Sequence, residues 1–234
     1  MPLAPLPEGP GLILVDKPAG VSSARVVDCV KRWIGIPRTG HGGTLDPFAT
    51  GLLPVLAGRA FTRDADRLLN GDKEYDLVIR FGSETDTGDL TGVVVARGPG
   101  PLPDADAIRA ALATFEGEVM QEPPAHSALK HEGRPLYWYA RRGEAVVKPA
   151  RAVRMGPIAL VEWLPPDARV RVACGKGAYM RSLARDLGRL LGCGAHLTGL
   201  RRTRVGDLSV ADAIPLWRFE QALGPRWHRG RREG

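Results

Sequence analysis

One carboxylate, Asp46, stands out because of the residues around it. It lies in the stretch RTGHGGTLDPFATG, residues 38–51, which contains four glycines and three threonines. Glycines let a substrate approach the backbone closely, and a carboxylate that points at the substrate can act as a nucleophile. An Asp before Pro is also common in Asx-type turns. The residue pattern alone leaves both roles open for Asp46.

A nucleophilic carboxylate must stay ionised in a pocket that excludes water, and an arginine is a natural partner for it. Opposite charges about 4 Å apart attract by roughly 4 kcal/mol at an effective dielectric constant of about 20, before desolvation is counted. Arg181, in the stretch GKGAYMR, is the candidate partner. The GKG before it can present backbone N–H groups to a phosphate or form only a tight turn.

The usual signatures of nucleotide and metal sites are missing from the sequence. There is no G-x-x-x-x-G-K-[ST], and GKGAYM departs from G-x-G-x-x-G at Met180. Neither H-E-x-x-H nor G-x-S-x-G occurs, and the five histidines lack metal-ligand spacing. We therefore expect a mechanism without metal, nucleotide or other cofactors.

The positive charge is concentrated near the C-terminus. The chain has 33 Lys and Arg against 26 Asp and Glu, but residues 1–170 carry a net charge of −1 and residues 171–234 one of +8. Of the basic residues 27 are Arg, which pairs with phosphate in a bidentate manner, so a polyanion is the expected partner. An Arg-rich genome would explain Arg in place of Lys, but not the clustering.

Length and composition favour a cytoplasmic globular protein. The 234 residues, 44% apolar and 25% charged, suit one large domain or one domain with a small appendage. No run of about 20 apolar residues occurs, and the N-terminus lacks the features of a signal peptide. Cys29, Cys174 and Cys193 are widely spaced, so we expect them to be reduced and mostly buried.

Hydrophobic periodicity predicts the elements that carry these residues. Residues 11–15 are typical of a buried strand, and Ser22 or Ser23 can cap the helix that follows. Residues 75–81 alternate with period two, which predicts a strand with Tyr75 on its apolar side. Further predicted elements are helices at residues 62–69 and after Asp104, a strand at residues 169–174, and a helix with leucines 183, 187, 190 and 191 on one side and arginines 181, 185 and 189 on another.

These elements do not follow the regular βαβ rhythm of a doubly wound sheet. The sequence therefore favours an α+β fold with a mixed, mainly antiparallel sheet flanked by helices. Few apolar residues follow Val210, and this tail is expected to be disordered without a partner.

Seven blocks of the sequence carry a family resemblance: GLILVDKPAGVSS, GHGGTLDPFATGLLPV, KEYDLVIRFGSETDTGD, QEPPAHSALK, LYWYAR, CGKGAYMRSLARDLG and LGCGAHLTGLRRTRVG. In this order, and over nearly all of residues 11–210, they resemble the TruB-type tRNA pseudouridine synthases. The resemblance implies the pseudouridine synthase fold and the isomerisation of uridine to pseudouridine at position 55, in the T loop of tRNA.

The resemblance also implies three catalytic residues. Asp46 matches the aspartate that attacks the target uridine, so that the uracil detaches from C1′, rotates and reattaches through C5. Tyr75 matches the tyrosine that stacks on the flipped uracil and helps to move the proton from the sugar. Arg181 matches the arginine that pairs with the catalytic carboxylate.

Other positions match residues that bind the RNA. His41 matches the loop histidine that stacks where the uridine has left the RNA, and Tyr179 and Leu200 match residues of the base pocket. Unstacking a base costs a few kcal/mol, and aromatic platforms such as Tyr75 and His41 can each return about 1 to 3 kcal/mol. The positions that match contacts to the RNA backbone are Lys17, Arg201, Arg202 and Arg204.

The chain departs from the family pattern at two positions and near its end. Gly42 replaces a threonine, which loosens the loop, and His126 replaces a tyrosine. Residues 8–180 are expected to form the catalytic domain, with an RNA-contacting insertion near residues 121–152, and residues 181–234 a basic segment that continues it. Only some 24 residues follow Val210, too few for the PUA domain that many bacterial members carry.

The expected partner is tRNA, bound at its T loop and elbow by a monomer without membrane or disulfide-linked partners. A noncatalytic module that binds the tRNA elbow or helps RNA to fold is the alternative, because a basic C-terminal quarter serves it equally well. A glycosidase-like hydrolase is a more remote one, with Asp46 and either Asp86 or Asp89 as its two carboxylates.

Overall fold

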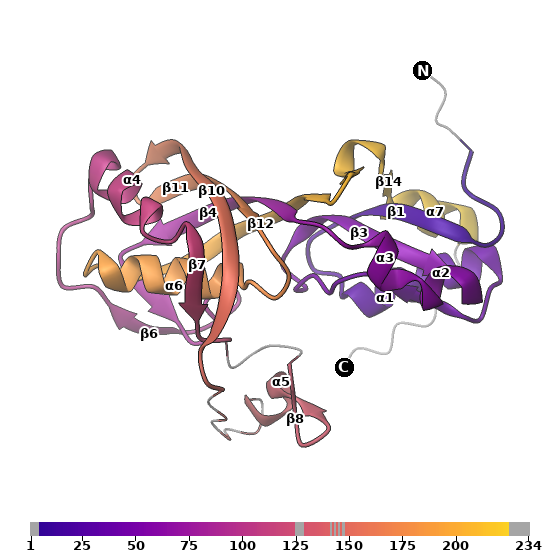
Figure 1. Ribbon diagram of the computed structural model, residues 1–234, viewed down its shortest axis with the longest axis horizontal. Helices are drawn as coiled ribbons and strands as arrows, with labels where there is room; N and C mark the ends of the chain where they lie inside the picture. Colours follow the sequence, from indigo (N-terminus) through magenta and orange to yellow (C-terminus); the bar gives the residue numbers. More distant parts are fainter. Residues whose placement is uncertain are drawn as a thin grey trace. The chain divides into compact units, whose positions relative to one another are not determined.

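The computed structural model describes residues 5–124, 129–140, 142, 144, 146 and 148–224 (Figure 1). The chain folds into two compact units. The first contains residues 1–71 and 201–234, and the second residues 72–200. The two units are divided after residues 71 and 200. The domain boundary that the sequence predicts at residue 180 stays a prediction.

The first unit contains four neighbouring strands in the order β14, β1, β3 and β12, of which β12 contributes its second half. β1 is antiparallel to β3, whereas β14 is parallel to β1 and β12 is parallel to β3. Nearly all of β3 is buried, as its continuous apolar sequence predicts for an inner strand. The strands are β1 (Gly11–Lys17), β2 (Thr39–His41), β3 (Thr50–Ala57), β12 (Ala195–Val205), β13 (Leu208–Ser209) and β14 (Ile214–Pro215).

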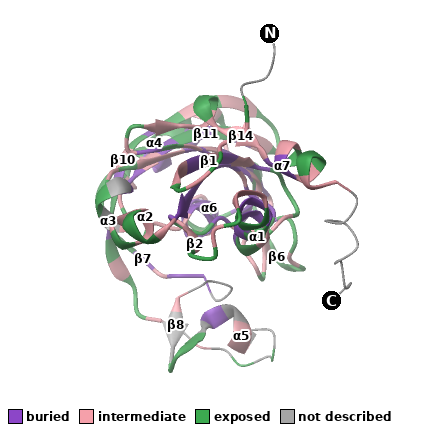
Figure 2. Cartoon of the chain, turned by 90° about the vertical axis from the view of Figure 1, so that its right-hand side faces the viewer, coloured by how far each residue is buried: buried purple, intermediate pink, exposed green. Residues whose placement is uncertain are grey.

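Helix α1 (Ser23–Ile34) of the first unit begins where the sequence predicts it. The Ser22 hydroxyl accepts a hydrogen bond from the Arg25 N–H at 3.2 Å and so caps the helix. The helix ends at Gly35, whose φ of 69° suits a glycine. Val26 and Val30 lie on its buried side, while the opposite side is exposed (Figure 2).

The second unit contains the first half of β12 and then β4, β11, β10 and β7, in this order. β4 alternates between buried and partly exposed residues, and Tyr75 is on the buried side, which confirms the period-two prediction. The strands are β4 (Lys73–Phe81), β5 (Ser83–Thr85), β6 (Val94–Arg97), β7 (Gly117–Gln121), β8 (Lys130–His131), β9 (Arg134–Pro135), β10 (Arg151–Leu164) and β11 (Asp167–Cys174).

Two helices cover this part of the sheet. α4 (Ala105–Ala113) contacts β10, and α6 (Met180–Leu190) contacts both β4 and α4. Asp104 caps α4 as predicted, because its carboxylate accepts a hydrogen bond from the Ala107 N–H at 2.8 Å. The predicted insertion contains β8, β9 and α5 (Leu136–Ala140); His126 lies outside the described residues.

This architecture confirms the predicted α+β class. Most of the described strand pairs are antiparallel, and the parallel pairs of β1 with β14 and β3 with β12 make the sheet mixed. The three cysteines are reduced and buried, as expected. Within the described ranges, no helix is long and apolar enough to cross a membrane.

Two expectations about local structure are wrong. The helix predicted at residues 62–69 is divided into α2 (Arg59–Arg63) and α3 (Ala65–Leu68), because Asp64 has φ −93° and ψ 17°. Residues 210–223, expected to be disordered after Val210, are folded. They form a 3₁₀ turn (Val210–Asp212), β14 and α7 (Leu216–Leu223), in which Leu216 and Phe219, one turn apart, are buried.

Candidate active site

Asp46 lies in the irregular segment between β2 and β3, in the first unit. A turn closes directly after it, because the Ala49 N–H donates to the Asp46 carbonyl at 3.1 Å. The Gly20 N–H donates to the Pro47 carbonyl at 2.8 Å and ties this turn to the chain that follows β1. Asp46 is partly buried, so it is shielded from part of the solvent but is still accessible.

Lys17, at the end of β1, lies beneath this turn. Its side chain is fully buried, and its ammonium donates to the carbonyls of Pro18 and Pro47 at 3.0 Å and of Ala49 at 2.5 Å. Burial lowers the pKa of Lys17 from 10.5 to about 8, although the Asp46 carboxylate opposes this by raising it. The site therefore places a buried cation next to the proposed nucleophile.

The four basic residues predicted to contact the RNA backbone have different surroundings. Lys17 and Arg202 are 0% and 1% exposed and donate to backbone carbonyls, so their contacts with RNA phosphates stay a prediction that this burial does not favour. Arg201 makes a bidentate pair with Asp16 at 2.8 and 3.0 Å. Arg204 is exposed and donates to a backbone carbonyl at 3.2 Å.

His41 is the last residue of β2 and lies five positions before Asp46. Its Nδ1 is buried without a hydrogen-bond partner in the part of the chain that the structure describes. Burial, together with the charge of Arg202, lowers the pKa of His41 below 6.5. The ring is therefore neutral at pH 7, which suits the stacking role that the resemblance implies.

The remaining predicted residues belong to the second unit. Tyr75 on β4 and Leu200 on β12 are each 8% exposed. Tyr179 immediately precedes α6, and the Arg151 guanidinium lies 5.3 Å from the centre of its ring. Their roles in a base pocket stay predictions.

Arg181, in the first turn of α6, is buried and has a carboxylate partner in its own unit. Its Nη1 donates to the Thr87 carbonyl at 2.9 Å, and its Nε lies 3.9 Å from Asp89 Oδ2. Asp89 also accepts hydrogen bonds from the Thr91 N–H and the Thr87 hydroxyl, both at 2.9 Å. Because Asp46 belongs to the first unit, its predicted pairing with Arg181 stays a prediction.

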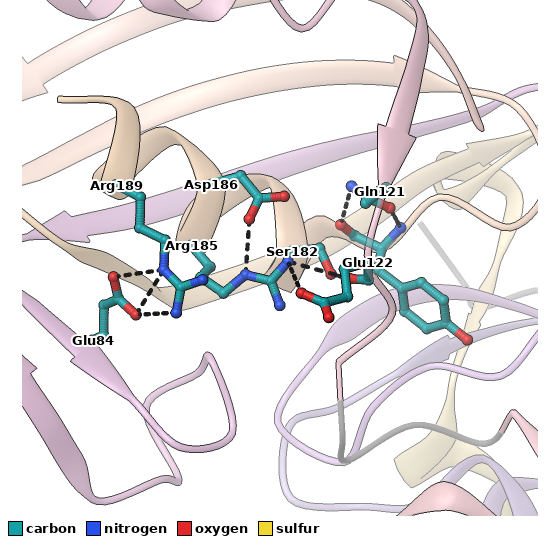
Figure 3. A network of polar contacts seen from close by, with 8 residues as sticks. Glu84, Gln121, Glu122, Ser182, Arg185, Asp186 and Arg189 are labelled. Carbon is teal, nitrogen blue, oxygen red and sulfur yellow. Dashed lines mark hydrogen bonds and ion pairs between the residues drawn. The ribbon is translucent and has the colours of Figure 1, made fainter. Parts of the chain in front are cut away.

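The start of α6 is held by the end of β7 (Figure 3). The Gln121 side chain donates to the Tyr179 carbonyl at 3.0 Å and accepts from the Tyr179 N–H at 2.7 Å. The Ser182 hydroxyl donates to the Glu122 carbonyl at 2.7 Å. This clamp fixes the residues on either side of Arg181.

The arginines of α6 do not form the basic face that the sequence predicts. Arg185 donates to Asp186 at 2.8 Å, and Arg189 makes bidentate contacts with Glu84 on β5 at 2.9 and 3.0 Å (Figure 3). The helical spacing of the arginines is correct, but carboxylates from the same unit neutralise them. Spacing along one helix cannot reveal those carboxylates.

Sequence reasoning missed Ser23 and Gln121 as functional candidates and considered Asp89 only as the second carboxylate of a hydrolase. Ser23 could be read only as a possible helix cap, whereas Asp89 had a further signal in its T-x-D-x-T spacing, in which both threonines bond to the aspartate. Gln121 is a single amide at the end of an expected connection, and no local pattern distinguishes it.

Comparison with known proteins assigns the chain to a family. Residues 31–180 match the model of the TruB family pseudouridylate synthase (N terminal domain), and residues 181–228 match the tRNA pseudouridylate synthase B C-terminal domain. The chain is 48% identical to tRNA pseudouridine synthase B of Aromatoleum aromaticum, over 90% of this chain and 68% of that protein. For the Bordetella avium protein of that name, the identity is 46%, over 92% and 89%.

Solved structures agree with the fold. An H/ACA RNP bound to a substrate RNA containing 2′-deoxyuridine has a chain that matches with a TM-score of 0.67 and 29% identity, over 95% of this chain. A chain of an archaeal box H/ACA sRNP Nop10-Cbf5 complex matches with a TM-score of 0.66 and 31% identity, over 90% of this chain. This chain spans 56% and 53% of the length of those two chains. It belongs to the TruB family of pseudouridylate synthases.

Proposed function

We propose that this chain isomerises uridine to pseudouridine at position 55, in the T loop of tRNA, with Asp46 as the nucleophile. The observation that carries the proposal is the position of Asp46: a partly buried carboxylate on a turn whose backbone is bonded to a buried cation, Lys17. The names of the curated relatives support tRNA as the substrate.

The reaction conserves all atoms. Asp46 attacks C1′, and the C1′–N1 bond of the uridine breaks as the bond from C1′ to the carboxylate oxygen forms. The free uracil turns so that C5 faces C1′. A C1′–C5 bond then forms while the C1′–O bond to Asp46 breaks, the proton on C5 leaves, and N1 gains a proton. The protein must therefore flip the nucleotide out of the RNA and hold a detached base, which needs an aromatic platform and a closed pocket.

Four further residues have a proposed role in this reaction. Tyr75 stacks on the flipped uracil and helps to move the sugar proton, while Arg181 keeps the Asp46 carboxylate ionised. The neutral His41 ring replaces the flipped base in the RNA stack, and Tyr179 lines the pocket. We further propose that the protein works in the cytoplasm as a monomer.

The test is the release of tritium from tRNA labelled at uracil C5. Asp46→Asn keeps the size of the side chain but removes the nucleophile, so release should fall to background. Asp28→Asn, the same change on the exposed side of α1, is the matched control and should be as active as the wild type. Undiminished release by Asp46→Asn would refute the catalytic assignment.

The noncatalytic alternative is not favoured. A module that only binds the tRNA elbow has no need for a partly buried carboxylate above a buried lysine. Digestion of the treated tRNA to nucleosides separates the two functions, because only the enzyme produces pseudouridine. Free uracil as the product would instead indicate a hydrolase.

A further inference from the structure

Two buried side chains from outside the loop hold the backbone just before Asp46. The first is Ser23, the first residue of α1, which is 3% exposed. Its hydroxyl donates to the Leu45 carbonyl at 2.9 Å, and the Leu45 N–H donates back to the hydroxyl oxygen at 2.9 Å. One hydroxyl thus satisfies both backbone groups of the residue that precedes the proposed nucleophile.

The second side chain is Arg202 on β12. Its Nη2 donates to the Gly43 carbonyl at 3.0 Å and its Nε to the Leu52 carbonyl at 2.8 Å, so the guanidinium connects the start of the loop to β3. Hydrogen bonds from a charged donor are roughly twice as strong as neutral ones. The backbones also touch here, because a Cβ at Gly51 would lie 2.3 Å from the Arg202 carbonyl oxygen.

These contacts act on the orientation of Asp46 through the peptide bond. The Leu45 carbonyl belongs to the planar unit that joins Leu45 to Asp46, so fixing it restricts the direction in which the Asp46 side chain leaves the backbone. If the Ser23 hydroxyl is removed, a buried carbonyl and a buried N–H lose their partners. The loop would then move to regain hydrogen bonds.

We propose that Ser23 and Arg202 are positioning residues of the nucleophile: they hold residues 43–45 so that the Asp46 carboxylate faces the substrate before the RNA binds. This inference rests on the proposed function of Asp46. It replaces the expectation that Arg202 contacts a phosphate of the RNA. Neither side chain touches the substrate, and both act through the backbone of the loop.

The first experiment compares Ser23→Ala with Ser22→Ala. Both variants lose a hydroxyl at the start of α1, but only Ser22 is bonded to the helix and only Ser23 to the loop. In the tritium-release assay, kcat should be about 100-fold lower for Ser23→Ala than for Ser22→Ala, while KM for tRNA is unchanged. A small misplacement of a reacting group has an effect of this order. Ser23→Thr keeps the hydroxyl and should recover most of the turnover.

The second experiment compares Arg202→Lys with Arg204→Met. A lysine at position 202 keeps the charge but cannot reach both carbonyls, so kcat should fall while KM and its salt dependence stay unchanged. The exposed Arg204 is the contrasting case, and its loss should raise KM with little change in kcat. Thermal melting of each variant shows whether it is folded at the assay temperature.

Each outcome decides the matter. Provided that Asp46→Asn is inactive, either of two results overturns the positioning role. The first is an equal kcat for Ser23→Ala and Ser22→Ala, and the second is a raised KM with normal kcat for Arg202→Lys. Failure of Ser23→Thr to recover turnover argues for a role in packing alone and also overturns it. If Asp46→Asn is active, the proposed function fails first, and the positioning role fails with it.

Discussion

Raising the pH should remove the proton from Lys17 while the chain is still folded. Its ammonium donates to three backbone carbonyls around the turn of Asp46, and burial lowers its pKa to about 8. The neutral amine has one N–H fewer and no charge, so the turn loses a contact and Asp46 loses a neighbouring cation. We expect kcat/KM, which reports the free enzyme, to fall about tenfold per pH unit above about pH 8.

Stability should change in the opposite direction. The unfolded chain keeps the proton on this lysine up to a pKa near 10.5, whereas the folded chain releases it at about 8. Between these values the unfolded state binds more protons, so the contribution of Lys17 to the free energy of unfolding rises with pH. The rise amounts to about 2 kcal/mol from about pH 7.5 to about pH 9.5, since one pKa unit corresponds to about 1.4 kcal/mol.

Urea unfolding and tritium release at the two pH values test both effects. The difference in unfolding free energy between wild type and Lys17→Met isolates this group from all others that titrate. Lys31→Met removes an exposed lysine and should follow the wild type in both measurements. A wild-type kcat/KM that stays level to about pH 9.5 would show that the neutral amine suffices. Equal pH slopes of stability for wild type and Lys17→Met would refute the burial argument.

Three further outcomes are expected. Gln121→Met removes both hydrogen bonds to the Tyr179 backbone and should lower stability by about 1 to 3 kcal/mol in urea unfolding, with reduced tritium release. Gly42→Thr restores the family residue but places a Cβ 1.7 Å from Leu69 Cδ1, so it should destabilise by about 1 to 3 kcal/mol, and less in a Leu69→Ala background. Cys29, whose pKa burial raises to about 12, should react with a thiol reagent at about pH 8 only after unfolding.

The predictions that rest on local signals agree with the structure. The alternation in β4 places Tyr75 in the core, and the polar residues before the apolar runs, Ser22 and Asp104, cap α1 and α4. Such signals depend only on residues that are neighbours in the chain, so they can be read directly from the sequence. The helix predicted at residues 62–69 is wrong because apolar spacing alone does not reveal the break at Asp64.

The inner contacts of the candidate site could not be predicted in this way. Lys17 bonds to a residue 32 positions away and Arg202 to one 159 positions away, and both lie among glycines and polar residues that are typical of a surface. Basic residues in such surroundings are usually exposed. Only the fold shows that Lys17 and Arg202, which the sequence suggests as RNA-binding residues, donate hydrogen bonds to backbone carbonyls of the loop.

The same reasoning changes what the charge distribution means. A basic residue is available to RNA only if the protein itself does not use its charge, and Arg181, Arg185 and Arg189 all contact carboxylates of their own unit. The second unit has 17 Lys and Arg against 16 Asp and Glu, whereas the first has 16 against 10. The first unit thus carries a net charge of +6, of which residues 201–234 supply +4. In that unit Lys17 and Arg202 already donate to backbone carbonyls, so we expect the phosphates of a bound RNA to contact its exposed arginines.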